Sequence, residues 1–367
     1  MTPEGYAGMT PTANGEMIQL ARESRGLTQK NLAQRAGISQ GNVSKFERGE
    51  LVPSATQLEN LASILDYPLS FFLRTNSVFG FGISMVFHRR RKSLAAIKLR
   101  KIQAEVNIRT MEIEKLLAGV EVESKNEFCE LDIDEFGGDA EYVADLVRAK
   151  WQLPLGPVKS VVGAIESAGG LVVKCDFGTQ KLDAVSHWGT GLPPIFFVNG
   201  SIPADRLRFT LAHEIGHIVM HRIPTSNMED EADRFASSFL LPRNEILPEL
   251  SLFSLERAMR LKRVWKVSIA ALVLRAYDLG VVPDWKKRKF FMELAAAGYR
   301  TREPVELEDE EPATVRKLIH TYRNHIGYTT QDLANMLSLK EREFCSSYLG
   351  ASLQMRRFPS LFENDQT

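Results

Sequence analysis

The residues best suited to chemistry in this chain are two histidines and a glutamate within Arg206–His221, which reads RLRFTLAHEIGHIVMH. Residues four apart lie on one face of a helix, so His213 and His217 can direct both imidazoles at one metal ion. Glu214 projects about 100° away from His213, yet its longer side chain can reach a water molecule beside that ion. Zinc hydrolases use this set of residues. We therefore predict that His213 and His217 bind Zn²⁺ and that Glu214 is the general base.

A catalytic zinc ion needs a third protein ligand. His221 lies about 12 Å from His213 along a straight helix, so we expect it to support the ligands rather than bind the ion. The segment Met228–Ala236, MEDEADRFA, combines acidic residues with helical apolar spacing. It can direct one carboxylate at the ion, which predicts a site of two histidines and one acid. A structural histidine pair is the alternative, but buried polar groups in an apolar helix need a partner.

A second motif lies near the N-terminus, in the run LTQKNLAQRAGIS over Leu27–Ser39. Thr28 is a suitable N-cap for a helix that runs to Ala36, and Gly37 suits a sharp turn. Ser39 can then cap a second helix, which predicts a helix-turn-helix that binds DNA, with protein contacts as the alternative use. The predicted contacts are base edges for Gln40, Asn42, Ser44 and Lys45, and phosphates for Gln29, Lys30 and Arg48.

Two further segments have patterns that fit more than one function. Residues 86–101 include seven arginines and lysines and no acid, which can extend a phosphate contact or be an ordinary solvated face. Near the C-terminus, Thr329–Ala334 resembles the start of a helix-turn-helix. Since no glycine suited to the turn follows, we expect a helical packing or interaction segment there.

The composition limits the location and the charge of any binding surface. The formal net charge is zero, so a DNA-binding surface must be a local patch balanced by acids elsewhere. The three cysteines are far apart in the sequence, which is typical of reduced thiols in a cytosolic protein. Residues 1–15 lack the basic and apolar regions of a signal peptide, and the longest apolar run, Val78–Phe87, is too short to span a bilayer. We therefore expect a cytoplasmic protein without a membrane partner.

The two motifs carry two family resemblances. Residues 15–74 resemble the Cro/C1-type (Xre) helix-turn-helix family over LTQKNLAQRAGIS and the following SKFERGELVPS. Gly41 departs from a typical recognition helix, because it offers no side chain to a base. Residues 141–242 resemble the ImmA/IrrE-type zinc metallopeptidases over RFTLAHEIGHIVMH, EDEADRFASSFLLP, PPIFFVNGSIPADR and VRAKWQLPLGPVKSVVGAIESAGGLVV.

The second resemblance assigns further roles by position. It implies that Glu231 is the third metal ligand, with Glu229 as the alternative, and that Asp233 orients one of the histidines. Arg208 would support the site through a salt bridge. His187 either stabilises an oxyanion or is an ordinary histidine at a strand edge.

The expected architecture is mainly α and multidomain. An all-α helix-turn-helix bundle precedes an α+β zincin-like domain with a small sheet and then a helical C-terminal segment. The sheet is expected from strands at Leu171–Cys175, Ala184–Trp188 and Ile195–Val198. The predicted parts are a disordered tail at 1–13, the helix-turn-helix domain at 14–75, a basic helical linker at 76–125, the peptidase-like domain at 126–300 and the helical segment at 301–367.

These resemblances imply a DNA-binding transcription regulator with a zinc metalloendopeptidase domain. Its reaction would be hydrolysis of a peptide bond in a partner such as a repressor, in a stress or mobile-element response. The alternative is a non-catalytic regulator or antitoxin whose zinc site is structural or sensory. A third possibility is self-cleavage within 76–125. The expected partners are a double-stranded DNA operator, a protein substrate or toxin-like protein, and a second copy in a homodimer.

Overall fold

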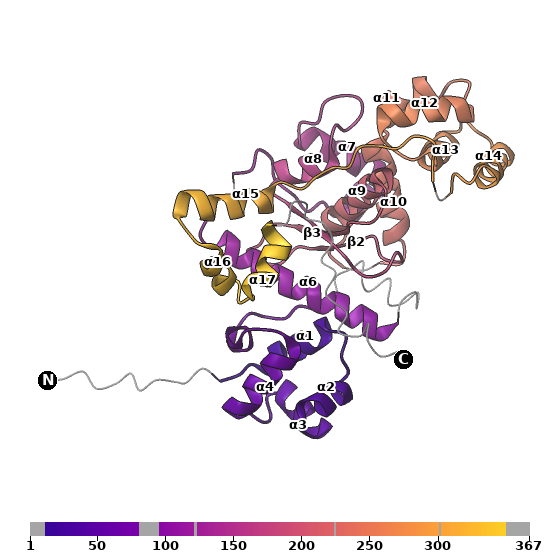
Figure 1. Cartoon of the computed structure of the whole chain (residues 1–367). Helices are drawn as coiled ribbons and strands as arrows, with labels where there is room; N and C mark the ends of the chain where they lie inside the picture. The colour runs from indigo at the N-terminus through magenta and orange to yellow at the C-terminus, as the bar shows by residue number, and fades with distance from the viewer. Residues whose placement is uncertain (1–11, 81–94, 121–122, 224, 301, 350–367) are drawn as a thin grey trace. The chain divides into compact units, whose positions relative to one another are not determined.

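The structure, a computed structural model, describes residues 12–80, 95–120, 123–223, 225–300 and 302–349 (Figure 1). These residues form two compact units. The first unit contains the described residues up to 120 and those from 317 to 349, and the second contains the described residues from 123 to 316. The predicted tail before residue 12 and most of the predicted basic run, including Arg89–Lys92, lie outside the described residues.

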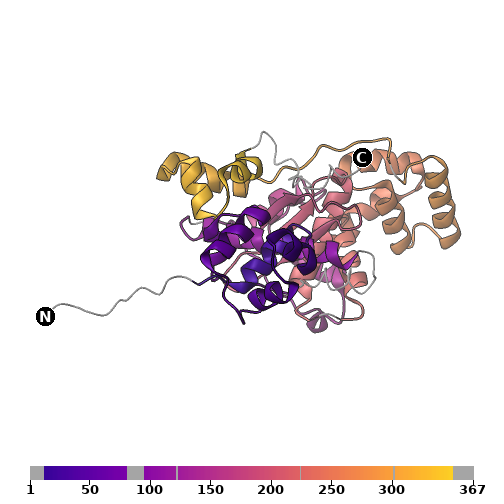
Figure 2. The ribbon, with the colours of Figure 1, turned by 60° about the horizontal axis from the view of Figure 1, so that its bottom comes forward.

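Helices alone build the first unit. Its N-terminal part is a bundle of short helices, drawn in indigo and violet in Figure 1 and Figure 2, that is followed by one long helix. These elements are α1 (Gly15–Ser24), α2 (Gln29–Ala36), α3 (Gln40–Glu47), α4 (Ala55–Leu65), the 3₁₀ turn η1 (Leu69–Leu73) and α6 (Ala96–Leu117). Apolar residues of α1 to α4 and η1 share a core with Ala104, Ile108 and Met111 of α6.

The C-terminal helices belong to the same unit. They are the end of α15 (Thr314–Thr321), the π-helical turn η4 (Tyr322–Ile326), α16 (Thr330–Met336), α17 (Glu341–Phe344) and the π-helical turn η5 (Cys345–Leu349). The Tyr322 hydroxyl donates to the carbonyl of Leu116 at 3.0 Å, and Arg74 donates to the carbonyl of Leu337 at 2.7 Å. Residues 317–349 therefore belong to the same compact unit as residues 12–80 and α6.

The second unit is mixed, with helices around a small sheet. Its helices are α7 (Ala140–Lys150), α8 (Val161–Ser167), α9 (Ala204–Met220), α10 (Met228–Leu240), α11 (Arg243–Ile246), α12 (Leu255–Trp265), α13 (Ile269–Asp278) and α14 (Asp284–Ala296), with 3₁₀ turns η2 (Ile133–Phe136) and η3 (Leu247–Leu250). The two motif helices α9 and α10 form where the sequence predicted helices, because apolar spacing marks both segments.

The sheet has three strands in the order β1-β3-β2. Strand β1 (Leu171–Cys175) pairs in parallel with β3 (Ile195–Asn199), and β2 (Ala184–His187) pairs antiparallel with β3. All five residues of β3 are buried, as expected for a central strand. The three predicted strands and the mainly α class are confirmed.

Helices α9 and α10 lie side by side, and α9 packs against β2 and β3 (Figure 1). Phe235 and Phe239 of α10 are fully buried and share a core with Leu211 and Ile215 of α9. Gly216 allows this close approach, since a Cβ at that position would lie 3.1 Å from the Phe235 ring. The packing brings the histidines of α9 next to the acids at the start of α10.

No helix among the described residues is long and apolar enough to cross a membrane.

Candidate metal centre and DNA interface

Helix α9 carries the two predicted ligands on one face. It begins after Pro203, and Asp205 lies in its first turn, where a negative charge is favoured. His213 and His217 are one turn apart, and their Nε2 atoms are 2.9 Å from each other. The His217 side chain is 2% exposed and that of His213 is 17% exposed. The two rings therefore meet at the edge of the core, as the four-residue spacing predicted.

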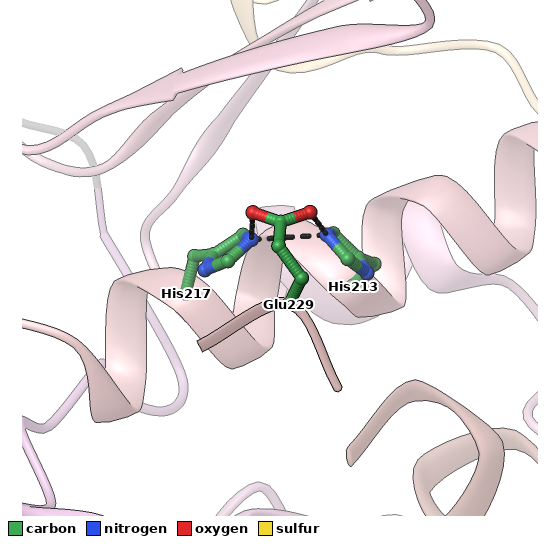
Figure 3. Close-up of side chains that lie close together, drawn as sticks. All are labelled: His213, His217 and Glu229. Carbon is green, nitrogen blue, oxygen red and sulfur yellow. Dashed lines mark hydrogen bonds and ion pairs between the residues drawn. The ribbon is translucent and has the colours of Figure 1, made fainter. Parts of the chain in front are cut away.

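The acid that lies nearest to both rings is Glu229 (Figure 3). Its carboxylate oxygens are 3.7 Å from Nε2 of His213 and 3.4 Å from Nε2 of His217. In Figure 3 the carboxylate of Glu229 spans the gap between the two imidazoles. These three residues form the group of possible metal ligands that the described part of the chain contains.

Glu231, the predicted third ligand, lies elsewhere. Its Oε2 is 3.0 Å from Nε2 of His221 rather than near the pair of facing nitrogens. The physical reason is the helical period: two residues along α10 turn a side chain by about 200°, so Glu229 and Glu231 leave the helix on nearly opposite sides. The geometry thus favours the alternative, Glu229, over Glu231 as a ligand to the same ion as His213 and His217.

The outer nitrogens of both histidines also have partners. Nδ1 of His213 is 2.8 Å from Oδ1 of Asp233, as expected for an orienting acid. Nδ1 of His217 is 3.0 Å from Nδ1 of His221, whose side chain is 1% exposed. Burial, followed by the neighbouring His217 and His213, lowers the pKa of His221 to about 4, so its ring is neutral near pH 7.

Because His221 is neutral, the hydrogen bonds of this network indicate which nitrogen of each histidine carries the proton. With Nε2–H of His221 donating to the Glu231 carboxylate, its Nδ1 accepts a hydrogen bond from Nδ1–H of His217. The Nδ1–H of His213 likewise donates to Asp233. In these tautomers the Nε2 atoms of His213 and His217 are the nitrogens available to bind a metal ion.

The donor set fits zinc in type and in spacing. Two imidazole nitrogens and one carboxylate are the ligands of many catalytic zinc sites. A tetrahedral ion with bonds of about 2.0–2.1 Å holds its ligand atoms roughly 3.3 Å apart. The separations of 2.9, 3.4 and 3.7 Å among His213, His217 and Glu229 bracket that value.

Glu214 follows His213 and is 4% exposed. Its Oε2 accepts a short hydrogen bond from the hydroxyl of Ser186 on β2. Burial lowers the pKa of His213, but the hydrogen bond to Asp233 and the charges of Glu214, Asp233 and Glu229 outweigh it, so the pKa is raised. Sequence reasoning missed Ser186, because no local pattern marks a strand residue that only the fold brings to α9.

The other two predicted supporting residues have different surroundings. Arg208 is 1% exposed, forms an ion pair with Glu310 and donates to the carbonyl of Val158 at 2.6 Å. It holds together segments of the second unit. His187 ends β2, and burial lowers its pKa.

The helix-turn-helix in the first unit has the predicted local structure. Thr28 caps α2, Ser39 caps α3, and Gly37 between them has φ of 66°. Leu32 and Val43 are fully buried, which holds the two helices together. Gly41, which has no side chain, lies on the exposed side of α3.

The predicted DNA contacts gather on one side of this motif. Five of them line a cleft of about 580 Å³ that also includes Arg100 of α6. They are Gln29, Lys30, Gln40, Ser44 and Arg48, whereas Asn42 and Lys45 lie outside this cleft, and Lys45 is exposed.

Gln29 is held in place by a buried ion pair. Its side-chain amide donates to Oε2 of Glu47 at 2.8 Å, and Glu47 in turn pairs with Arg22 at 2.5 Å. The side chains of Arg22 and Glu47 are 7% and 3% exposed.

Comparisons with known proteins match the two segments that carry these residues. Residues 18–72 match the family model described as helix-turn-helix, and residues 165–277 match a peptidase family model described as IrrE N-terminal-like domain. Uncharacterized HTH-type transcriptional regulators of Sinorhizobium medicae (strain WSM419) and Rhizobium meliloti (strain 1021) are each 36% identical over 58 residues. That match covers 16% of this chain and 42% of each relative. The chain thus combines a helix-turn-helix of transcription regulators with an IrrE-type metallopeptidase domain.

Proposed function

We propose that this protein is a cytoplasmic transcription regulator that binds an operator through Gln29–Arg48 and hydrolyses a peptide bond in a partner protein at a zinc site. The observation that carries the proposal is the convergence of His213, His217 and Glu229, with Glu214 beside them, in a chain that also has a DNA-binding motif. The partner would be a protein such as a repressor, in a stress or mobile-element response.

In this proposal His213, His217 and Glu229 hold the metal, and Glu229 replaces Glu231 as the third ligand. Zinc bound there supplies Lewis acidity toward a water molecule and a peptide carbonyl. Glu214 takes a proton from the attacking water and delivers it to the leaving amine. Asp233 keeps the His213 ring in the tautomer whose Nε2 can bind the metal.

The test combines metal content with proteolysis. Wild type, Glu214→Gln and Glu229→Gln are purified, and each is incubated with the product of the neighbouring gene. We expect about one zinc per chain in wild type and Glu214→Gln, little zinc in Glu229→Gln, and cleavage by wild type alone. Zinc in wild type without cleavage of any candidate repressor would refute hydrolysis, and absence of zinc in all three would refute the metal site.

The burial and the hydrogen bond of Glu214 favour a second function. Its carboxylate is buried and bonded to Ser186, which is compatible with a site that holds zinc without turnover. The protein would then be a regulator or antitoxin whose zinc is structural or sensory, and whose protein partner is toxin-like. Full regulation of a reporter by Glu214→Gln in cells, with loss of regulation in Glu229→Gln, would support this function over hydrolysis.

Self-cleavage between residues 76 and 125 is a distinct route to regulation. Because residues 317–349 pack with α6 in the first unit, a cut there would leave the helix-turn-helix attached through noncovalent contacts. Mass spectrometry of zinc-loaded protein after prolonged incubation would show two fragments.

We also propose that the protein binds its operator as a homodimer, because two-fold sites match two recognition helices. Light scattering in the presence of operator tests this.

A further inference from the structure

Residues 329–349 repeat the local structure of the helix-turn-helix near the N-terminus. Thr329 caps α16 as Thr28 caps α2: each hydroxyl accepts a hydrogen bond from a backbone N–H, that of Asp332 in one case and of Asn31 in the other. Both distances are 3.1 Å. The first helix of each segment therefore begins in the same way.

The turn after that helix is also the same. Gly37 has φ of 66°, and Ser338 at the matching position has φ of 50°. The N–H of the next residue donates back to the helix in both, at 3.1 Å from Ile38 and at 2.8 Å from Leu339. The absence of a glycine had indicated that no such turn would follow Thr329–Ala334, and that expectation is wrong, because Ser338 takes the left-handed conformation and α17 follows.

The buried positions coincide as well. Leu32 of α2 and Leu333 of α16 are both fully buried, and so are Val43 of α3 and Phe344 of α17. The first N-cap, the turn and the core thus agree in order and spacing, whereas Lys340, which matches Ser39, makes no side-chain cap hydrogen bond. Residues 329–349 form a second helix-turn-helix.

The second motif carries different side chains at the positions that match the predicted DNA contacts, with Arg342 in place of Gly41. Glu341 and Glu343 occupy the positions of Gln40 and Asn42, and Leu349 occupies that of Arg48. Carboxylates at the start of a recognition helix repel phosphates, whereas amides and cations contact bases and phosphates.

The second helix of this motif instead contacts the first motif's bundle. Glu343 lies 3.8 Å from Arg25, and Lys340 forms an ion pair with Asp66 just after α4. Farther along, the Tyr348 hydroxyl donates to Glu112 of α6 at 2.6 Å. Among the positions that match the predicted DNA contacts, Glu343 makes such a protein contact, whereas Gln331, Glu341 and Ser346 are exposed.

We propose that residues 329–349 are a helix-turn-helix module that binds the chain's own DNA-binding domain in place of DNA. The occupied surface is the C-terminal end of α4 together with α6. This inference does not depend on the zinc site, so the failure of either proposal leaves the other untouched.

The first test compares matched positions in the full-length chain. The pairs are Lys30→Ala with Gln331→Ala and Lys45→Ala with Ser346→Ala, each assayed on the operator that the wild type selects from a random duplex library. We expect the affinity to fall about 5- to 10-fold at Lys30 and Lys45 and by less than about twofold at their counterparts. Equal losses in both motifs would make the second motif a DNA reader and overturn the proposal.

The second test measures hydrogen exchange in the full chain. Phe344→Asp should raise deuterium uptake severalfold in residues 61–67 and 104–117, while residues 161–175 of the other unit stay unchanged. Lys340→Glu should raise uptake in 61–67 alone, and adding Asp66→Lys should restore protection. Unchanged uptake in 61–67 in both Phe344→Asp and Lys340→Glu would overturn the proposal. If Phe344→Asp unfolds the whole chain, the charge-reversal pair decides.

Discussion

At the scale of single residues, the third metal ligand depends on which face of α10 each acid occupies. Glu229 lies beside His213 and His217, whereas Glu231 is hydrogen-bonded to His221. Loss of a direct ligand should weaken metal binding more than loss of a residue that only contacts a neighbour of the ligands.

Glu229→Gln should therefore lower zinc affinity by more than about 100-fold, because it removes a charged ligand, whereas loss of an outer partner costs roughly 10- to 100-fold. Glu231→Gln is the matched variant and should stay in that smaller range. Competition with a chromophoric chelator measures both affinities. A larger loss in Glu231→Gln than in Glu229→Gln would restore Glu231 as the ligand.

His221 is a positioning residue for His217 in the same network. His221→Ala should lower zinc affinity about 10- to 100-fold, because Nδ1 of His217 loses the acceptor that selects its tautomer. His221→Asn should recover most of this loss, since its amide oxygen can accept the same hydrogen bond. Nitrogen chemical shifts of the His217 ring would report the tautomer directly. If alanine and asparagine behave alike, His221 only fills space.

At the scale of elements, the site depends on how closely α9 and α10 pack. Gly216 faces the Phe235 ring, and a Cβ there would already be in tight contact at 3.1 Å. Since α10 carries Glu229 and α9 carries the histidines, the spacing of the two helices determines the spacing of the ligands.

Gly216→Val should destabilise the second unit by about 1–3 kcal/mol, the usual cost of overpacking a core, and should also weaken zinc binding. Adding Phe235→Leu makes room and should recover part of both losses. Chemical denaturation of the zinc-free protein and chelator competition measure the two effects. Stability and zinc affinity equal to those of wild type in Gly216→Val would show that the helices tolerate a wider spacing.

At the scale of the whole molecule, the charge is neutral and the DNA-binding surface is local. Lys30, Lys45 and Arg48 lie exposed on the helix-turn-helix, although the chain carries equal numbers of acids and bases. Binding should therefore depend on salt through these few residues rather than through the net charge.

Arg48→Gln should reduce the slope of log affinity against log salt by about 1, because one phosphate contact releases about one counterion. Arg323→Gln, at an exposed arginine near the second helix-turn-helix, is the control and should leave the slope unchanged. Titrations of operator at several salt concentrations measure both slopes. A similar change in the two variants would indicate a general charge effect.

Much of this protein was predictable from local patterns. The caps Thr28 and Ser39, the turn at Gly37 and the four-residue spacing of His213 and His217 are all properties of a few consecutive residues. Helical period and capping act over single turns, so a sequence displays them directly. The same holds for the three strands, whose apolar runs end at glycine, proline and polar residues.

The tertiary structure alone decided what these elements meet. The position of Glu229 beside the two histidines depends on the rotation of α10 against α9, and the hydrogen bond between Ser186 and Glu214 depends on where β2 lies. The return of residues 317–349 to the first unit joins segments more than 200 residues apart, as the Tyr322–Leu116 bond shows. A sequence read in short windows specifies which faces are apolar, but the pairing of those faces follows from packing the whole chain at once.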